Sequence, residues 1–473
     1  MKMRMDSQKA RVAKRANVVQ QLPNGPALRR ASLRLLNRGI FSHLEPHRNT
    51  KWTFGELSLL ASTWAWLEHS TLTGAFQYAK LWSQDVGQKP CIGTYVGFVK
   101  SLETWTGELM PLICESLRQR MEEIGDRWRI GRWMPLAVDG SRISAPRTKA
   151  NEATFCAPNF GKSENASYRA NRRRKEGRAK RKNSAPPKPQ IWVTMLWHMG
   201  LQMPWSWKTG PSNSNERTHL QQSLTMQKFP PETLFCCDAG FTGYDLWSDL
   251  DRQNHKFLIR VGGNVRLLKK LGYARRENKD TVYLWPAKHR RDQPPLVLRL
   301  LQVKVGKRKV CLVTNVLDEK ELTAAEARRL YELRWGVEVQ FRTLKQTFER
   351  RIVRSRTPQN ALVELDWSIA GLWMIQLMAA QEQAQAESPP PECSASIAIA
   401  VVREALRRPR ERPTIPFEQR LRQATKDGYQ RKRSKKARYQ PQNNDKPTRG
   451  KPIILVAQPK DIKQLADYHP KAA

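Results

Sequence analysis

The sequence predicts an α/β protein, because strand-like and helix-like segments alternate along its central part. Between Arg132 and Asn315, short apolar runs are separated by turn residues and by amphipathic segments of helix length. The order strand, hairpin, helix, strand, helix, strand is typical of a mixed sheet covered by helices. The chain has 473 residues, which is enough for several domains and a substantial core.

Residues 1–130 are predicted to form a helical N-terminal domain. The part before Thr53 is basic and loosely patterned, and the part from Thr53 to about Asp126 has helical periodicity. Such a domain either binds DNA ends or braces the domain that follows. The arginines and lysines that precede it favour DNA binding.

A main domain is predicted over residues 131–262 and 310–385, with a β-rich insertion over residues 263–309 between the two parts. The first part contains a strand that ends at Asp139-Gly140, a hairpin around Gly200, a helix, and a strand that ends at Asp238. The insertion is expected to consist of short strands only. The predicted order of its segments is VRLLKKL, TVYLWPA and LVLRLLQVKV.

Residues 386–473 are predicted to form a basic C-terminal region that is partly disordered. A similar segment begins at Asn171, where charge and proline are too frequent for a packed core. Each segment could be a solubilising arm or a DNA contact, and the sequence leaves both interpretations open.

The charge balance predicts a polyanionic partner. Lys and Arg total 84 against 43 Asp and Glu, which gives a formal charge of +41. Nucleic acid is the first partner to consider, and an anionic membrane surface is the second. The longest apolar stretch begins at Leu362 and is interrupted by Glu364, Asp366 and Gln376, so we expect a buried helix and no membrane span.

The N-terminus and the cysteines predict a reducing compartment. The segment MKMRMDSQKARVAKR has positive charge but no apolar region, so we expect a cytoplasmic, chromosome-associated protein. The seven cysteines include no C-x-x-C pair, which disfavours structural zinc and disulfides.

One predicted helix carries an unusual set of polar residues on a single face. A capping box of Thr323 and Glu326 marks its start, and an apolar stripe beside the polar face indicates docking on a core. The interpretation without function is a solvated face with helix-stabilising charges. The polar face consists of Tyr331, Arg334, Glu338, Arg342 and Lys345.

Three carboxylates on three elements suggest a metal site. Asp139 and Asp238 each end an apolar run, and Glu338 lies on the docked helix. Singly, an aspartate before glycine is more often a turn residue. If the three groups converge at one sheet edge, their repulsion needs a cation, and two Mg²⁺ ions there would suit phosphodiester cleavage. The chain has no H-E-x-x-H, phosphate-loop or G-x-S-x-G motif to favour other hydrolases.

The spacing Y-(2)-R-(3)-E-(6)-K from Tyr331 to Lys345 completes the pattern. With AVDG around Asp139 and CDAGF around Asp238, the chain from about Arg132 to Ala380 resembles the DDE transposases of insertion-sequence family number four. The resemblance implies a ribonuclease H-like catalytic core with a β-rich insertion before the glutamate. It also implies that Asp139, Asp238 and Glu338 bind two Mg²⁺ or Mn²⁺ ions.

The resemblance further implies cut-and-paste movement of DNA, with a hairpin intermediate and a flipped base. Tyr331, Arg334 and Lys345, with Arg342 nearby, would contact DNA phosphates. Trp285 would stack on the flipped base, although a core tryptophan of the small sheet is an equal alternative. The partners would be the inverted-repeat ends and target DNA, held by a homodimer.

The function expected from the sequence is therefore that of a DNA transposase. One alternative is a nuclease of the same fold that does not transfer strands. The other is an inactive or domesticated DNA-binding protein, against which the presence of all three acidic residues argues.

Overall fold

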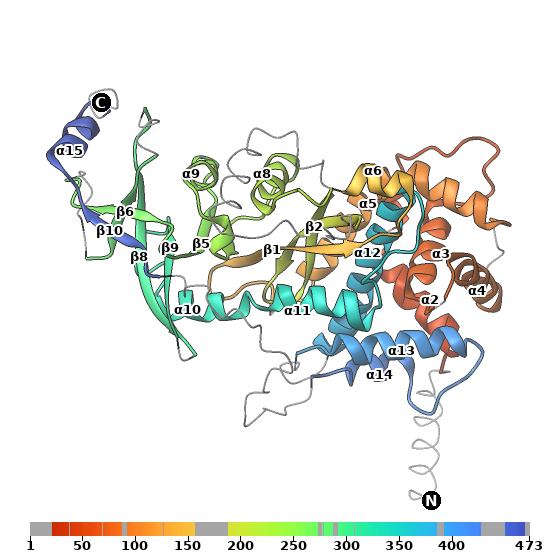
Figure 1. The fold of residues 1–473 in the computed structure, drawn as a ribbon. Coiled ribbons are helices and arrows are strands. Elements are labelled where there is room, and N and C mark those ends of the chain that lie inside the picture. Colours follow the sequence, from red (N-terminus) through yellow and green to blue (C-terminus); the bar gives the residue numbers. More distant parts are fainter. Residues whose placement is uncertain are drawn as a thin grey trace, which may run out of the picture. The chain divides into compact units, whose positions relative to one another are not determined.

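The computed structural model in Figure 1 divides the chain into two compact units. A helical unit comprises residues 1–124, 346–350 and 359–428, and a sheet unit comprises residues 125–345, 351–358 and 429–473. The structure describes residues 21–36, 38–68, 70–87, 92–125, 127–156, 188–272, 277, 279–286, 292–306, 308–385, 392–426 and 450–468.

The helical unit contains the helices predicted near the N-terminus. The α3 helix begins with a capping box of Thr53 and Glu56, and Thr71 and Thr94 cap the next two helices. Its helices are α2 (Asn24–Leu35), the 3₁₀ turn η1 (Arg38–Phe41), α3 (Phe54–Trp66), α4 (Leu72–Asp85), α5 (Tyr95–Glu122), α12 (Pro358–Ala384), α13 (Ala395–Arg407) and α14 (Phe417–Arg422).

The long α12 helix groups with these helices, whereas the sequence assigned residues up to 385 to the main domain. Its surface is apolar nearly all round, so it packs as a central helix. The indole N–H of Trp66 donates to the carbonyl oxygen of Gly371 at 2.9 Å. Among the described helices, α12 alone has the length and hydropathy of a membrane span, and it is almost wholly buried, as expected for the stretch from Leu362.

The sheet unit is built on one ten-stranded sheet with the order β10-β6-β7-β8-β9-β5-β4-β1-β2-β3. The strands predicted for the main domain and for the insertion are all present. They are β1 (Met134–Ser144), β2 (Gln190–His198), β3 (Met203–Gly210), β4 (Thr233–Cys237), β5 (Lys256–Val261), β6 (Arg266–Lys269), β7 (Thr281–Leu284), β8 (Leu296–Val305), β9 (Arg308–Thr314) and β10 (Ile453–Val456).

Two types of strand pairing meet at β1. It runs antiparallel to β2, which forms the predicted hairpin with β3, and parallel to β4. The β4 strand in turn runs parallel to β5. Every side chain of β4 is buried, which explains its continuous apolar sequence TLFCC.

The strands of the insertion extend this same sheet. The β9 strand pairs antiparallel with both β5 and β8, so it joins the insertion to the main part of the sheet. The β10 strand, from the predicted C-terminal region, pairs in parallel with β6 and is followed by α15 (Pro459–Ala466). The described end of the C-terminal region is therefore part of the sheet.

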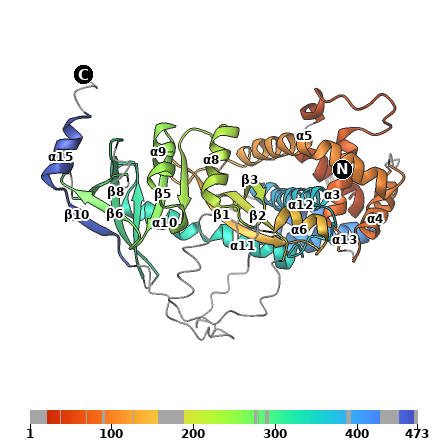
Figure 2. The same ribbon diagram turned by 45° about the horizontal axis from the view of Figure 1, so that its top comes forward.

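Helices lie on both faces of the sheet. Figures 1 and 2 show α8 (Glu216–Met226) and α9 (Tyr244–Arg252) on one face, and α10 (Ala324–Leu333) and α11 (Gly336–Arg342) on the other. The short helix α6 (Lys149–Phe155) follows β1, and the 3₁₀ turn η2 (Ala239–Phe241) follows β4.

The helix predicted to begin near Thr323 and to carry the polar face from Tyr331 to Lys345 is divided in the structure. The capping box of Thr323 and Glu326 is present, but the helix is interrupted at Trp335 between α10 and α11. Gly336 lies against the ring of Trp197, where a Cβ atom would clash, so the chain there follows a close contact rather than helix propensity. A π-helical turn, η4 (Thr343–Thr347), ends the segment.

Candidate active site

The two predicted aspartates lie on neighbouring parallel strands. Val138 is paired with Cys237, so Asp139 and Asp238 follow at the same level of the sheet. Asp238 follows the end of β4, and its carboxylate accepts a hydrogen bond from the Gly240 N–H at 2.6 Å.

Asp139 does not end its strand, contrary to the sequence interpretation. The β1 strand continues to Ser144 because the hairpin strand β2 still pairs with it beyond Asp139. What ends at this level is the pairing with β4. The Asp139 carboxylate therefore lies at a step in the sheet, half-buried, where one neighbouring strand has stopped.

The third predicted carboxylate comes from a helix on one face of the sheet. Glu338 lies in the first turn of α11, and its Oε1 atom is 3.0 Å from Nη2 of Arg334. Arg334 precedes the break before α11, and its side chain is 8% exposed. A buried cation and a partly exposed acid thus face the strand that carries Asp139.

The other two carboxylates act on Asp139. The pKa of Asp139 is raised to about 6, mainly by burial and also by the charges of Glu338 and Asp238, while Arg334 and the Gly140 N–H oppose the rise. Carboxylates that repel each other in a half-buried site are stabilised by a cation. The described side chains provide only part of that compensation.

Within the described residues, no three acidic, histidine or cysteine groups are arranged to hold a metal ion as their side chains lie. As the side chains lie, Glu338 is paired with Arg334, and Asp238 accepts a hydrogen bond from the Gly240 N–H. The set of donors still suits Mg²⁺ or Mn²⁺, which prefer carboxylate oxygens.

A fourth carboxylate, Glu216, reaches the same place and was missed by sequence reasoning. A Cβ atom built on Gly140 would lie 2.8 Å from Oε1 of Glu216, and one built on Gly240 would lie 3.6 Å from its Oε2. Burial raises the pKa of Glu216 to about 7, and Asp139 and Asp238 add to the rise, while Arg217 and Arg334 oppose it. Its sequence position, at the start of a helix, is that of an ordinary helix-stabilising acid.

The predicted polar face is divided between the core and the surface. Tyr331 is 7% exposed, and the guanidinium carbon of Arg334 lies 5.6 Å from the centre of its ring. The Nε and Nη1 atoms of Arg334 have no hydrogen-bond partner among the described residues. The face is therefore not the uniformly solvated surface of the non-functional interpretation.

The other two cations of this face differ in their surroundings. Lys345 Nζ donates to Ser141 Oγ on β1 at 2.6 Å, and burial lowers the pKa of this lysine, assisted by Arg351 and opposed by Asp139. Arg342 is exposed and has no ion-pair partner in the described part of the chain.

Trp285 lies away from these carboxylates in a small core. It is 7% exposed and packs with Leu268, Leu271 and Tyr283 of the insertion and with residues near β10. The same tryptophan lines a surface pocket together with Tyr244. Stacking on a flipped base would require Trp285 to leave this core.

Two further expectations can be compared with the structure. The basic segment that begins at Asn171 lies outside the described residues as far as residue 187 of the chain, and the described part resumes at residue 188. No disulfide joins two of the six cysteines in the described part of the chain.

Comparison with known proteins identifies the family. Residues 135–374 match the family described as transposase DDE domain, which is about half of the chain and contains Asp139, Asp238 and Glu338. A region of 166 residues is 28% identical to the transposase InsG for insertion sequence element IS4 of Escherichia coli (strain K12). That similarity covers 33% of this chain and 36% of the relative, so the chain matches about a third of the relative's length.

A solved structure is also similar over most of its length. It is the cryo-EM structure of a piggyBac transposase synaptic complex with hairpin DNA, with a TM-score of 0.38 and 12% sequence identity. The similarity covers 84% of this chain and 85% of that one. On the match of residues 135–374, the chain belongs to the family of proteins with a transposase DDE domain.

Proposed function

We propose that this protein is a DNA transposase that cuts at the ends of its element and joins the 3′-hydroxyl ends to target DNA. The observation that carries the proposal is the position of Asp139 and Asp238 on adjacent parallel strands, with Glu338 brought toward them from α11. The mutual effect of these carboxylates on the pKa of Asp139 supports a common site.

We infer a ribonuclease H-like core for this domain. The supporting observation is the order β3-β2-β1-β4-β5, in which an antiparallel hairpin adjoins three parallel strands. In this arrangement the helix carrying Glu338 packs on the strand that carries Asp139. The inference does not depend on whether the insertion forms a separate domain.

Asp139, Asp238 and Glu338 would hold the divalent ions, two Mg²⁺ or Mn²⁺. Such a pair of ions activates a water or a 3′-hydroxyl and stabilises the leaving oxygen. The chain would supply the carboxylate oxygens. In the structure, Glu338 is paired with Arg334. For Glu338 to act as a ligand, its carboxylate has to turn away from Arg334, and this releases the guanidinium for an anion.

The released guanidinium suggests how the DNA backbone is bound. Arg334 would then offer its nitrogens to a phosphate, with the Tyr331 ring fixing its plane. Lys345 and Arg342 would contact further phosphates on the same side. For Trp285 we favour a role in the core of the insertion. Stacking on a flipped base is the alternative, and substitution of Trp285 would test it.

The proposal includes the partners expected from the sequence. These are the inverted-repeat ends and target DNA, bound by a homodimer on the chromosome, with the helical segment 1–130 assisting at the ends. The formal charge of +41 supports a polyanionic partner.

The test is a cleavage and strand-transfer assay on DNA that carries the sequences flanking the gene. Asp139→Asn, Asp238→Asn and Glu338→Gln keep size but remove charge, so each should lower metal-dependent cleavage by at least about a hundredfold. The assay is run with Mg²⁺, with Mn²⁺ and with chelator. Circular dichroism checks that the variants are folded.

A matched control is Glu332→Gln. Glu332 is an exposed glutamate of α10 that pairs with Arg328 of the same helix. This variant should cleave as the parent protein does. Parent-level cleavage by Glu338→Gln would refute the three-carboxylate mechanism. Cleavage without joining of a pre-cleaved end to a plasmid would instead identify a nuclease, and binding without cleavage an inactive DNA-binding protein.

A further inference from the structure

The side chain of Glu216 reaches from α8 to Gly140 within β1 and to Gly240 after the end of β4. Its carboxylate occupies the space beside Gly140 on β1 and Gly240 after β4, where neither residue has a side chain. A Cβ atom on Gly140 would lie 2.7 Å from Cγ of Glu216, which is too close for any ordinary contact. Gly140 directly follows Asp139, and Gly240 lies two residues after Asp238.

The start of α8 does not need Glu216 for its own stability. Asn215 is the N-cap, and its side-chain oxygen accepts a hydrogen bond from the Thr218 N–H at 2.9 Å. The backbone of this helix start is therefore already capped. Glu216 is free to point toward the sheet instead of back to its own helix.

A second contact holds the start of α8 next to Asp238. Arg217 Nε donates to the carbonyl oxygen of Gly240 at 2.7 Å. Arg217 therefore donates this hydrogen bond to a backbone carbonyl group and not to the Glu216 carboxylate. Within the described residues, Glu216 has neither a hydrogen bond nor an ion pair of its own.

The site therefore holds more negative charge than the chain compensates. The buried guanidinium of Arg334 acts on Asp139, Glu216 and Glu338. Among the described residues its ion pair is with Glu338, and its Nε and Nη1 atoms have no hydrogen-bond partner there. A half-buried carboxylate without a partner, such as Glu216, is costly, and a bound cation lowers that cost.

We propose that Glu216 is a fourth carboxylate ligand of the divalent ions held between Asp139 and Asp238. This inference rests on the proposed function, because it assigns a further ligand to the same ions. Glu216 lies on α8 and Glu338 on α11, and Figures 1 and 2 show these two helices on opposite faces of the sheet. With four carboxylates, each of two ions could receive more than one protein ligand.

The experiment measures metal binding directly, without DNA. Mn²⁺ is titrated into the full-length protein, and free Mn²⁺ is followed by electron paramagnetic resonance. Glu216→Gln should weaken Mn²⁺ binding at least about tenfold or remove one ion from the stoichiometry. Glu216→Asp keeps the charge with a shorter reach, so it should bind more tightly than Glu216→Gln.

The control is Glu122→Gln, which removes an exposed carboxylate of α5 and should leave the titration unchanged. Asp139→Asn is titrated alongside. If Asp139→Asn loses Mn²⁺ but Glu216→Gln and Glu216→Asp both bind as the parent does, the fourth ligand is refuted and the proposed function stands. If Asp139→Asn also binds as the parent does, the proposed metal site itself is refuted.

Discussion

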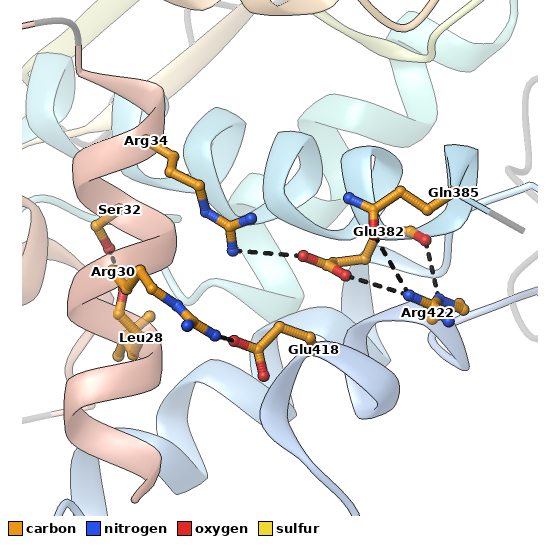
Figure 3. Close-up of polar contacts among 8 residues, drawn as sticks. All are labelled: Leu28, Arg30, Ser32, Arg34, Glu382, Gln385, Glu418 and Arg422. Atoms are coloured by element: carbon orange, nitrogen blue, oxygen red, sulfur yellow. Dashed lines mark hydrogen bonds and ion pairs between the residues drawn. The ribbon is translucent and has the colours of Figure 1, made fainter. Parts of the chain in front are cut away.

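Buried acids in the helical unit and in the sheet unit are treated differently. Glu382 on α12 is 5% exposed, and its two oxygens face Arg34 at 3.5 Å and Arg422 at 3.6 Å, as Figure 3 shows. In the same close-up, Glu418 pairs with Arg30. The acids of this region thus each have an arginine within the unit.

The carboxylates of the candidate site lack that balance. The pKa of Asp139 is raised to about 6 and that of Glu216 to about 7, in both cases mainly by burial and also by neighbouring carboxylates. The pKa of Glu382 is also raised by burial, but Arg34 and Arg422 oppose the rise. A buried charge that the chain compensates is structural, whereas one that it leaves uncompensated marks a place for a ligand.

The largest expected effect on stability concerns His198 of the sheet unit, whose two ring nitrogens both have hydrogen-bond partners. His198 is fully buried on β2; its Nδ1 accepts from the Leu201 N–H at 3.0 Å, and Nε2 lies 3.1 Å from the Trp128 carbonyl oxygen. Burial lowers its pKa to about 3, and its backbone hydrogen bonds oppose the shift. The ring is therefore held neutral.

This neutral ring predicts acid sensitivity of the sheet unit. Below about pH 6.5 the unfolded chain binds a proton on His198 that the folded chain does not, so stability falls as the pH falls toward 3. We expect a loss of about 1–3 kcal/mol between pH 7 and 4.5 in urea unfolding. In His198→Gln the loss over that interval should be smaller. An equal loss in both proteins would show that His198 does not cause it.

Glu382 should show a smaller effect on the helical unit. Glu382→Gln removes the charge that two arginines share, and the unfolding free energy should fall by about 1–2 kcal/mol because both arginines remain partly exposed to water. Urea unfolding followed by tryptophan fluorescence measures it. Glu122→Gln, which removes an exposed acid of the same unit, is the control and should change little. Unchanged stability in Glu382→Gln would mean that this compensation is not structural.

The sequence allowed the strands and the three-carboxylate pattern to be predicted because both depend on local order. Apolar runs such as TLFCC indicate strands, and the residues after them lie where parallel strands end. The capping box at Thr323 is equally local and was confirmed. The class of fold and the family followed from such signals.

What could not be predicted depends on contacts between distant segments. Glu216 approaches Asp139 only because α8 is anchored beside Gly240, and no spacing in the sequence encodes that bond. The close approach of Gly336 to the ring of Trp197 likewise joins segments far apart in the sequence. The pairing of β10 with β6 joins segments nearly two hundred residues apart, which periodicity cannot detect.

The smallest expected effect concerns Lys345, a cation of the site that forms no ion pair with a described carboxylate. Within the described residues it donates a hydrogen bond to Ser141, so we expect its charge to be available to a phosphate. Lys345→Ala should weaken binding of the element's end several-fold and reduce the slope of log K against log[salt] by about 0.9, the value for one phosphate contact. Lys304→Ala, which removes an exposed lysine of β8, is the matched control and should leave the slope unchanged.

Fluorescence anisotropy over a range of salt concentrations measures both variants. An unchanged slope in Lys345→Ala would mean that this lysine only supports β1 through Ser141, and the contrast between compensated and available charge would then not extend to the cations of the site.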